Sequence, residues 1–581
     1  MANGFGSLYV GASAIQSQQN ALNVVANNLS NVNTKGYVRQ QVLFADRNYT
    51  SFASADISAQ RLGLGVDIGD VVHARDVFLD KAYRSESGRQ AFYATSYDAI
   101  TEVETLLQET QGVAFKEALA DLHQAFAEYA KDPSDAVNQN LVMQKSSLFV
   151  SRVSNLNQGL QDYQLTINKK ISDDVKRINE LGEKISKLNL QIQRIEAAGV
   201  ETAMDLRDTR DLCIDELSKL AKVSFKEDSD GVIKVQLEDV EFVTETRCNQ
   251  MALHEDLSNG FQTPYWPQLS DTGNDVYTEV FNTKNASAEN NTDVGEVKAL
   301  LLARGDHHAN YLDIEGLSSQ QYDKGLANSI MENNEAELDK LYHTIITQIN
   351  DVLCPNKTAG EIYGASLAAP ITGTTADGKT IQINENTTIL DEASCSVGSD
   401  GKIPPQELFT RIGCDRYTQV QVNIDGEDKT LYVYNEEDPQ DLSKCYTIEY
   451  TKINPALVED ESLLAHKTQN GAVDYDLGAK LETIWNDADY TINPSDTTPC
   501  TFTDFYVKWI GNVGTTGSVY STTASSLEAT RDTIDNNRQM VVGVSSDEEL
   551  TNMIKYQQAY NAASRYINVV STMIDYLLQS L

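Results

Sequence analysis

The sequence predicts an α+β multidomain protein with coiled-coil-like terminal helices, a long helical rod domain and one or more inserted β-rich outer domains. Three observations predict this fold. Apolar residues recur at helical spacing near both ends, a long helical pattern runs from about 136 to 198, and short period-two strands lie within 355–520. A chain of 581 residues is long enough for several hydrophobic cores.

Both ends of the chain carry an apolar seam with coiled-coil spacing. The N-terminal seam consists of Leu8, Ile15, Leu22, Val25, Leu29 and Val32, with Gly11 and Gln18 at weaker positions. The C-terminal seam consists of Met553, Tyr556, Tyr560, Ala563, Ile567, Val570, Ile574, Leu577 and Leu581. A lone helix cannot bury such a face, so each seam needs a partner helix in the same chain or in a neighbouring copy. The pattern leaves both alternatives open, and we predict that these residues form an assembly interface.

A run rich in Asn follows the first helix, from Ala26 to Gln40. Its Asn side chains can satisfy local backbone groups, and Gly36 can adopt a left-handed conformation without a Cβ clash. Taken alone, this run is a helix stop followed by a loop. The loop residues that we single out are Asn27, Asn28, Asn31, Asn33, Thr34, Gly36 and Tyr37.

Helices are predicted next at 92–107 and 115–126, where apolar residues share one face. Pro133 ends the second of them, because proline disfavours helix in the residue before it. A long helix follows over about 136–198, and Gly199 ends it. Asp205 then begins an antiparallel return helix, with carboxylates suited to the positive end of the helix dipole.

Beyond Val223 the apolar period changes towards two, which predicts hairpins among Asp and Gly turns. The remaining predicted elements are helices at 295–304, 335–353 and 524–537 and strands at 379–383, 420–424 and 430–434. The predicted domains are a terminal helical assembly domain (1–47 and 546–581), a helical rod domain (48–222, 290–354 and 521–545), a β-rich insert (223–289) and β-rich outer domains (355–520).

The Asn-rich run closely resembles the N-terminal signature of flagellar rod, hook and hook-associated proteins, in which an Ala-Asn-Asn stretch leads to Asn-Thr-Pro-Gly-Tyr. Lys35 stands here where that signature usually has Pro. Further stretches resemble the hook-associated proteins of the hook–filament junction, namely Asp205–Leu212 with its continuation to Leu220, Lys131–Asp135, Gly295–Leu301 and Tyr556–Ala563. The chain is therefore identified as a member of this axial protein family, and the junction proteins are its best match.

The resemblance implies a structural axial protein that joins the hook to the filament by helical self-assembly and transmits torque. The implied partners are the hook protein, a second junction protein, further copies of the chain and a flagellar export chaperone. The implied location is extracellular, in the bacterial flagellum, after export by the flagellar type III apparatus without a cleaved signal peptide. Two alternatives stay open: another axial subunit of the hook or distal rod, or an axial scaffold that displays a glycan-binding or adhesive β-rich insert.

Other function classes find little support in the sequence. The formal net charge of -39 argues against nucleic-acid partners and anionic membrane surfaces, and no apolar run is long enough to span a membrane. His254 begins a zinc-protease-like pattern, but Ser258 stands where the second His is needed. The seven cysteines form no Cys-x-x-Cys pair, and no P-loop is present. We expect no enzyme activity, no catalytic residues, no metal site and no cofactor.

Overall fold

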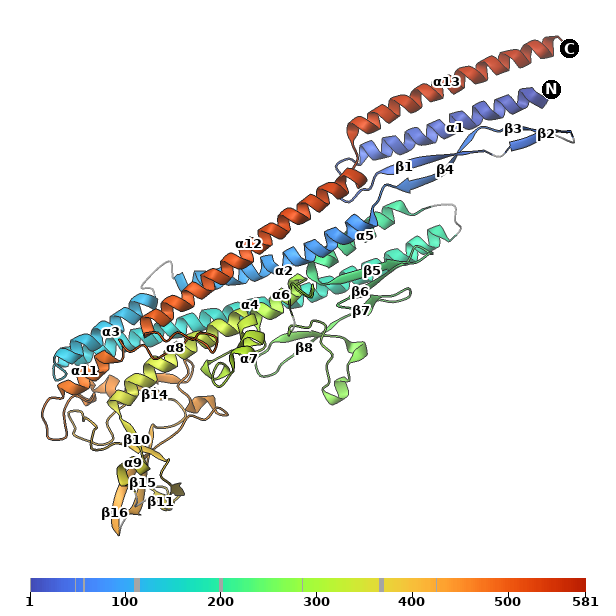
Figure 1. Ribbon diagram of the computed structural model, residues 1–581. Helices are drawn as coiled ribbons and strands as arrows, with labels where there is room; N and C mark the ends of the chain where they lie inside the picture. The colour runs from blue at the N-terminus through green and yellow to red at the C-terminus, as the bar shows by residue number, and fades with distance from the viewer. Residues whose placement is uncertain are drawn as a thin grey trace.

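The computed structural model describes residues 2–47, 49–55, 58–108, 115–197, 202–284, 286–364, 370–424 and 426–580. The molecule is elongated, with both termini side by side at one end and the β-rich region at the other (Figure 1). The predicted α+β fold class, with long terminal helices and an inserted β-rich region, is confirmed. Among the described residues, no helix combines the length and apolarity needed to cross a membrane.

Helices α1 (Ala2–Ser30) and α13 (Ser546–Gln579) lie side by side at the terminal end (Figure 1). An antiparallel hairpin of β1 (Gln40–Asp46) and β4 (Val66–His73) packs along α1, and β2 (Tyr49–Ala55) pairs with β3 (Ser58–Gly63). The domain boundary expected at residue 47 is therefore misplaced, because the strands up to His73 belong with the terminal helices rather than with the rod.

The rod is a helical bundle that contains the predicted helices. Its main members are α2 (Val77–Gln108), α3 (Phe115–Lys131), α4 (Ala136–Glu196), α5 (Met204–Leu220), α6 (Glu296–Arg304), α8 (Ile330–Leu353) and α12 (Phe502–Val542). The long α4 begins at Asp135, whose side chain accepts a hydrogen bond from the Val137 amide. Buried residues at heptad spacing on α4, including Ile171, Ile178 and Ile185, contribute to the main core.

Residues 502–520 correct the predicted outer domain, because they are helical rather than β-rich. Thr501 caps the first turn of α12 by accepting a hydrogen bond from the Asp504 amide. Phe502, Phe505 and Trp509 are buried at helical spacing and join the rod core. These aromatic residues therefore anchor the start of a rod helix, which packs along α2.

The β-rich parts form several small sheets. The first insert holds β5 (Val223–Glu227), β6 (Ile233–Leu237) and β7 (Val240–Val243) in one sheet and β8 (Ala252–Glu255) with β9 (Gln262–Tyr265) in another. The outer region holds a six-stranded sheet in the order β10 (Asn356–Thr358), β13 (Thr388–Leu390), β16 (Glu427–Tyr434), β15 (Tyr417–Ile424), β11 (Ile371–Thr375) and β12 (Thr380–Ile383). The strands β14 (Phe409–Arg411) and β17 (Thr451–Ile453) pair separately. Of the short helices, α7 (Ser319–Lys324) lies between α6 and α8 in the chain, α9 (Ala359–Tyr363) and α10 (Pro455–Glu459) belong to the outer region, and α11 (Tyr475–Thr483) packs against α3.

Candidate assembly site at the paired termini

The two terminal seams meet within one chain. On α13 the predicted residues Met553, Tyr556, Tyr560, Ala563, Ile567, Val570 and Ile574 are partly or fully buried, whereas Leu577 is exposed and Leu581 lies outside the described residues. On α1 Val25 is buried, Leu8, Ile15, Leu22 and Leu29 are half-buried, and Val32 is exposed beyond the helix end. Of the two alternatives that the pattern left open, pairing inside the chain is the one that the structure contains.

Close approach of the two helices depends on Gly11. A Cβ atom added at this position would lie 2.5 Å from Cγ1 of Ile567 on α13. Glycine is therefore the residue that lets α1 and α13 touch at this level, although it gave only a weak signal in the apolar seam. Nearer the N-terminal end of α13, the ring of Tyr556 packs edge-on against Phe44 of β1 at a centroid distance of 6.0 Å.

A second face of α1, which the apolar pattern missed, packs against the hairpin. Ser13, Ser17 and Ala21 are buried there at four-residue spacing. The Ser17 hydroxyl donates a hydrogen bond to the backbone carbonyl of Val66 at 3.1 Å. Small polar side chains let a strand backbone approach the helix, but they do not register as an apolar stripe. In the sequence, only the recurrence of a small residue at every fourth position indicates this contact.

Asn28 is the central residue of the Asn-rich loop. Its side chain is 1% exposed, and its Nδ2 donates to the Gln40 carbonyl at 3.0 Å and to Oε2 of Glu549 on α13 at 3.2 Å. Its Oδ1 accepts from the Tyr37 hydroxyl at 2.8 Å and from the Gln40 amide at 3.1 Å. Burial, together with the nearby Asp208 and Glu549 carboxylates, raises the pKa of Tyr37 to about 12, so its hydroxyl keeps the proton that it donates. The buried amide thus joins α1, its loop, β1 and α13.

The other loop residues shape the turn itself. Asn31 donates from Nδ2 to the Asn27 carbonyl and side-chain oxygens, each at 3.0 Å, and accepts from the Thr34 hydroxyl at 3.1 Å. Asn33 is exposed. Gly36 has a φ of +81°, and a Cβ atom there would lie 2.6 Å from Cγ of Leu212 on α5. The loop therefore touches the rod at a position where a side chain cannot fit.

Buried carboxylates on α5 connect three helices of the rod next to this loop. Asp215 accepts hydrogen bonds from Arg84 of α2 and from Arg538 of α12, both at 2.6 Å. Asp211 accepts from the same Arg84 at 3.1 Å and also pairs with Arg75. Because each arginine also pairs with a second carboxylate, Arg84 with Asp211 and Arg538 with Asp80 of α2, these contacts form one network that connects α2, α5 and α12.

The same α5 motif reaches the terminal unit through Asp208. Its Oδ2 accepts a hydrogen bond from the Val38 amide at 3.1 Å, and its Oδ1 lies 3.1 Å from Nδ1 of His73 at the end of β4. The Asp-rich motif that resembles junction proteins is therefore a structural connector. The two arginines of the motif pair elsewhere: Arg207 binds Glu196 of α4, and Arg210 binds Glu227 of β5.

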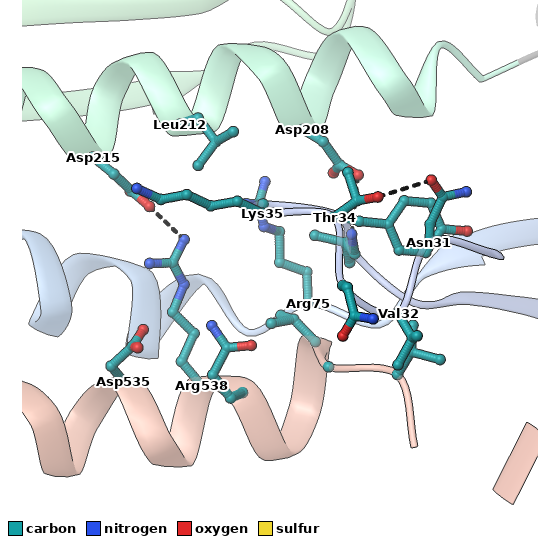
Figure 2. A pocket seen from close by; sticks show the side chains of 18 of the residues that line it. Asn31, Val32, Thr34, Lys35, Arg75, Asp208, Leu212, Asp215, Asp535 and Arg538 are labelled. Atoms are coloured by element: carbon teal, nitrogen blue, oxygen red, sulfur yellow. Dashed lines mark hydrogen bonds and ion pairs between the residues drawn. The ribbon is translucent and has the colours of Figure 1, made fainter. Parts of the chain in front are cut away.

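A polar cavity of about 330 Å³ lies where the loop, α5 and α12 meet. Figure 2 shows Lys35 extended along α5, with Asp215 paired to Arg538 beneath it and Thr34 hydrogen-bonded to Asn31. Nowhere in the described ranges do three or more His, Cys, Asp or Glu side chains gather in a way that could hold a metal ion. The arrangement is a joint between the terminal helices and the rod.

Comparisons with protein families divide the chain in the same way. Residues 8–37 match the family described as flagella basal body rod protein, and residues 541–580 match the flagellar basal body rod FlgEFG protein C-terminal family. Residues 100–360 match the flagellar hook-associated protein FlgK helical domain. The paired terminal helices thus correspond to the part that rod proteins share, and the bundle corresponds to the hook-associated part.

Relatives of full length support this result. The chain is 23% identical to flagellar hook-associated protein 1 of Bacillus subtilis (strain 168), covering 100% of this chain and 99% of the relative. It is 22% identical to the protein of that name from Salmonella typhimurium, over 97% and 98% of the two chains. A solved flagellar hook junction protein FlgK from Burkholderia pseudomallei is 11% identical, covers 79% of this chain and 99% of its own, and superposes with a TM-score of 0.47. The chain belongs to the flagellar hook-associated proteins, as a full-length relative of hook-associated protein 1.

Proposed function

We propose that this chain is a structural subunit of the bacterial flagellum that joins the hook to the filament. The full-length relatives are hook-associated proteins, and the two terminal segments match rod protein families. Shared ends are expected of subunits that stack in one continuous tube, because each must present the same kind of helix pair to its neighbours. The chain acts mechanically and has no catalytic role.

One observation carries this proposal: α13 has a second apolar stripe that α1 does not cover. Val569, Met573 and Tyr576 each precede a seam position by one residue, so they lie about 100° around the helix from the seam, whereas Tyr566 lies next to Gly11 of α1. Met573 is 62% exposed and Tyr576 is 69% exposed. Large apolar side chains grouped on one helix face mark a surface that another helix covers.

The seams and the stripe then have different tasks. The seams pair α1 with α13 inside each copy, and the exposed stripe on α13 packs against the terminal helices of neighbouring copies. Such a contact joins unlike surfaces of identical subunits, so it repeats along a helical tube instead of closing into a dimer. Full burial of one side chain such as Met573 contributes roughly 1.5–3 kcal/mol, and the contact repeats in every copy.

Torque passes from the terminal pair to the rod through the joint at Asn28, Gly36 and the α5 carboxylates. Buried groups held by hydrogen bonds and ion pairs resist the small rotations that a flexible linker would allow. The proposed partners are the hook protein at one end, a second junction protein at the other, neighbouring copies at the sides and an export chaperone before assembly. The chain leaves the cell through the flagellar type III apparatus and acts outside the cell.

Two substitutions on α13 test the proposal. Met573→Asp places a charge on the exposed stripe, so we expect an unchanged monomer by circular dichroism and thermal unfolding, but loss of incorporation into filaments. Ile567→Asp faces Gly11 inside the pair, so it should disturb the monomer's terminal helices as well as assembly, while the β-rich region stays folded. Asn561→Asp, at an exposed position on the same helix, is the control. Normal incorporation of the Met573→Asp variant would contradict the proposal.

A further inference from the structure

A second cavity, of about 400 Å³, continues from the joint along α5. Three lysines line it from three different segments: Lys35 of the Asn-rich loop, Lys184 of α4 and Lys219 of α5. All three side chains belong to exposed residues. We call this feature the lysine groove. Half-buried Leu212 contributes an apolar wall that it shares with the first cavity.

The carboxylates of the groove are already engaged inside the molecule. Asp215 binds Arg84 and Arg538, and Glu216 binds Arg177 at 2.6 Å. None of the three groove lysines has a carboxylate oxygen within 4.0 Å among the residues that the structure describes. The groove therefore presents cationic charge that the chain itself leaves without an ion pair.

The overall negative charge of the protein indicates a role for this groove. With a formal net charge of -39, copies of the chain repel one another unless their contacts place cations against carboxylates. We propose that the lysine groove is a docking surface for a carboxylate-bearing surface of a second copy of this chain. The inference rests on the proposed function, because it assigns one of the side-by-side contacts that assembly requires.

The position of the groove fits this role. It lies at the joint between the terminal helices and the rod, next to the exposed end of the N-terminal seam at Val32. The apolar stripe of α13 lies about 30–45 Å along that helix from its start at the joint (Figure 1), so a neighbour that contacts both surfaces extends along the terminal pair and meets the lysines with its carboxylates at the joint. The apolar contact supplies affinity, and the charged contact steers the approach and fixes the alignment of the two copies.

The test compares association of full-length chains by sedimentation velocity over a range of concentrations and ionic strengths. The groove variant K35E/K184E/K219E should need at least about tenfold higher concentration to associate at low salt. The matched variant K116E/K169E/K226E carries the same charge change at exposed lysines elsewhere and should stay within about twofold of the unmodified chain. The variant K35R/K184R/K219R keeps the charge and should associate normally.

Each outcome has a distinct meaning. If the unmodified chain does not associate under any condition, the proposed function fails. If it associates and the groove variant associates equally well, the lysine groove is not a docking surface, while the proposed function stands. A photo-crosslinking residue in place of Lys219 gives a second measurement: a crosslink to an Asp- or Glu-bearing peptide of another copy is expected in assembled samples, and its absence there would overturn the inference.

Discussion

The Asn28 side chain on α1 donates a hydrogen bond to Glu549 on α13, across 521 positions of sequence. Both residues are buried, and the same Asn28 amide also binds Tyr37 and both backbone groups of Gln40. One side chain thereby sets the position of the last helix relative to the first loop. This relationship explains why an Asn-rich loop accompanies paired terminal helices: the loop supplies the polar contact that fixes how far the two helices slide past each other.

Replacing Asn28 by Ala should loosen the terminal pair. The substitution leaves the Gln40 amide, the Tyr37 hydroxyl and the Glu549 carboxylate without this partner, at a cost of about 2–4 kcal/mol for buried groups. We expect faster amide hydrogen exchange throughout α1 and α13 and unchanged exchange in α4. The control is Asn27→Ala, which removes an exposed side chain and should leave exchange in α13 as it is. Equal exchange in the two variants would rule out a special role for Asn28.

Replacing Gly36 by Ala should destabilise the joint for two separable reasons. The positive φ of +81° alone costs about 1 kcal/mol for a residue with a Cβ atom, and contact with Leu212 adds about 1–3 kcal/mol. Gly260→Ala isolates the first cost, since Gly260 has a φ of +73° and a Cβ atom there would meet no atom beyond its chain neighbours within 4 Å. In urea unfolding, the free energy of unfolding of Gly36→Ala should be well below that of Gly260→Ala. Adding Leu212→Ala should reduce the destabilisation that Gly36→Ala causes.

Replacing Asp215 by Asn should weaken the attachment of α12 to α5. The neutral amide cannot balance Arg84 and Arg538, which keep only Asp211 and Asp80 as ion-pair partners, so we expect a cost at or below the lower end of the about 3–5 kcal/mol typical of a broken buried ion pair. Asp205→Asn removes an equal charge from an exposed position in the first turn of the same helix and should cost less than about 1 kcal/mol. The measurement is the free energy of unfolding from denaturant titration. A loss of equal size in both variants would show that the network does not hold the helices.

The elements that could be predicted from the sequence are those whose own residues carry a local apolar pattern. The heptad spacing of Ile171, Ile178 and Ile185 sufficed for α4, because a long apolar stripe has only one stable solution. The start of α12 escaped prediction because its aromatic residues follow a Thr- and Pro-rich stretch that resembles a β-domain. Capping by Thr501 decides the helix there.

The joint was harder to predict, because its contacts connect residues far apart in sequence. Nothing around Asp208 indicates that it binds the Val38 amide 170 positions away. The buried face with Ser13 and Ser17 also lacks an apolar signal, since its task is close approach rather than apolar burial. Family resemblance found the Asn-rich loop, but only the structure explains that Asn28 is the residue that reaches α13.

A buried carboxylate between the rod and the outer region makes the stability of the protein depend on pH. Asp339 of α8 accepts hydrogen bonds from the backbone amides of Tyr311 at 2.9 Å and Ile448 at 2.7 Å. Burial nevertheless raises its pKa from 3.8 to about 6, so the folded protein binds a proton here more tightly than the unfolded chain does. This contribution to stability is therefore fully present below about pH 4 and is lost as the pH rises through about 6.

The variant Asp339→Asn removes this titration. The difference in unfolding free energy between the unmodified chain and the variant should favour the unmodified chain most at low pH and shift against it by about 3 kcal/mol between pH 4 and 7. Denaturant titrations at several pH values measure that difference directly. Asp476→Asn, exposed on α11, makes the same change in net charge and corrects for general charge repulsion. A difference that stays constant with pH would show that Asp339 is already ionised in the folded protein throughout this range, so that its two backbone hydrogen bonds outweigh the cost of its burial.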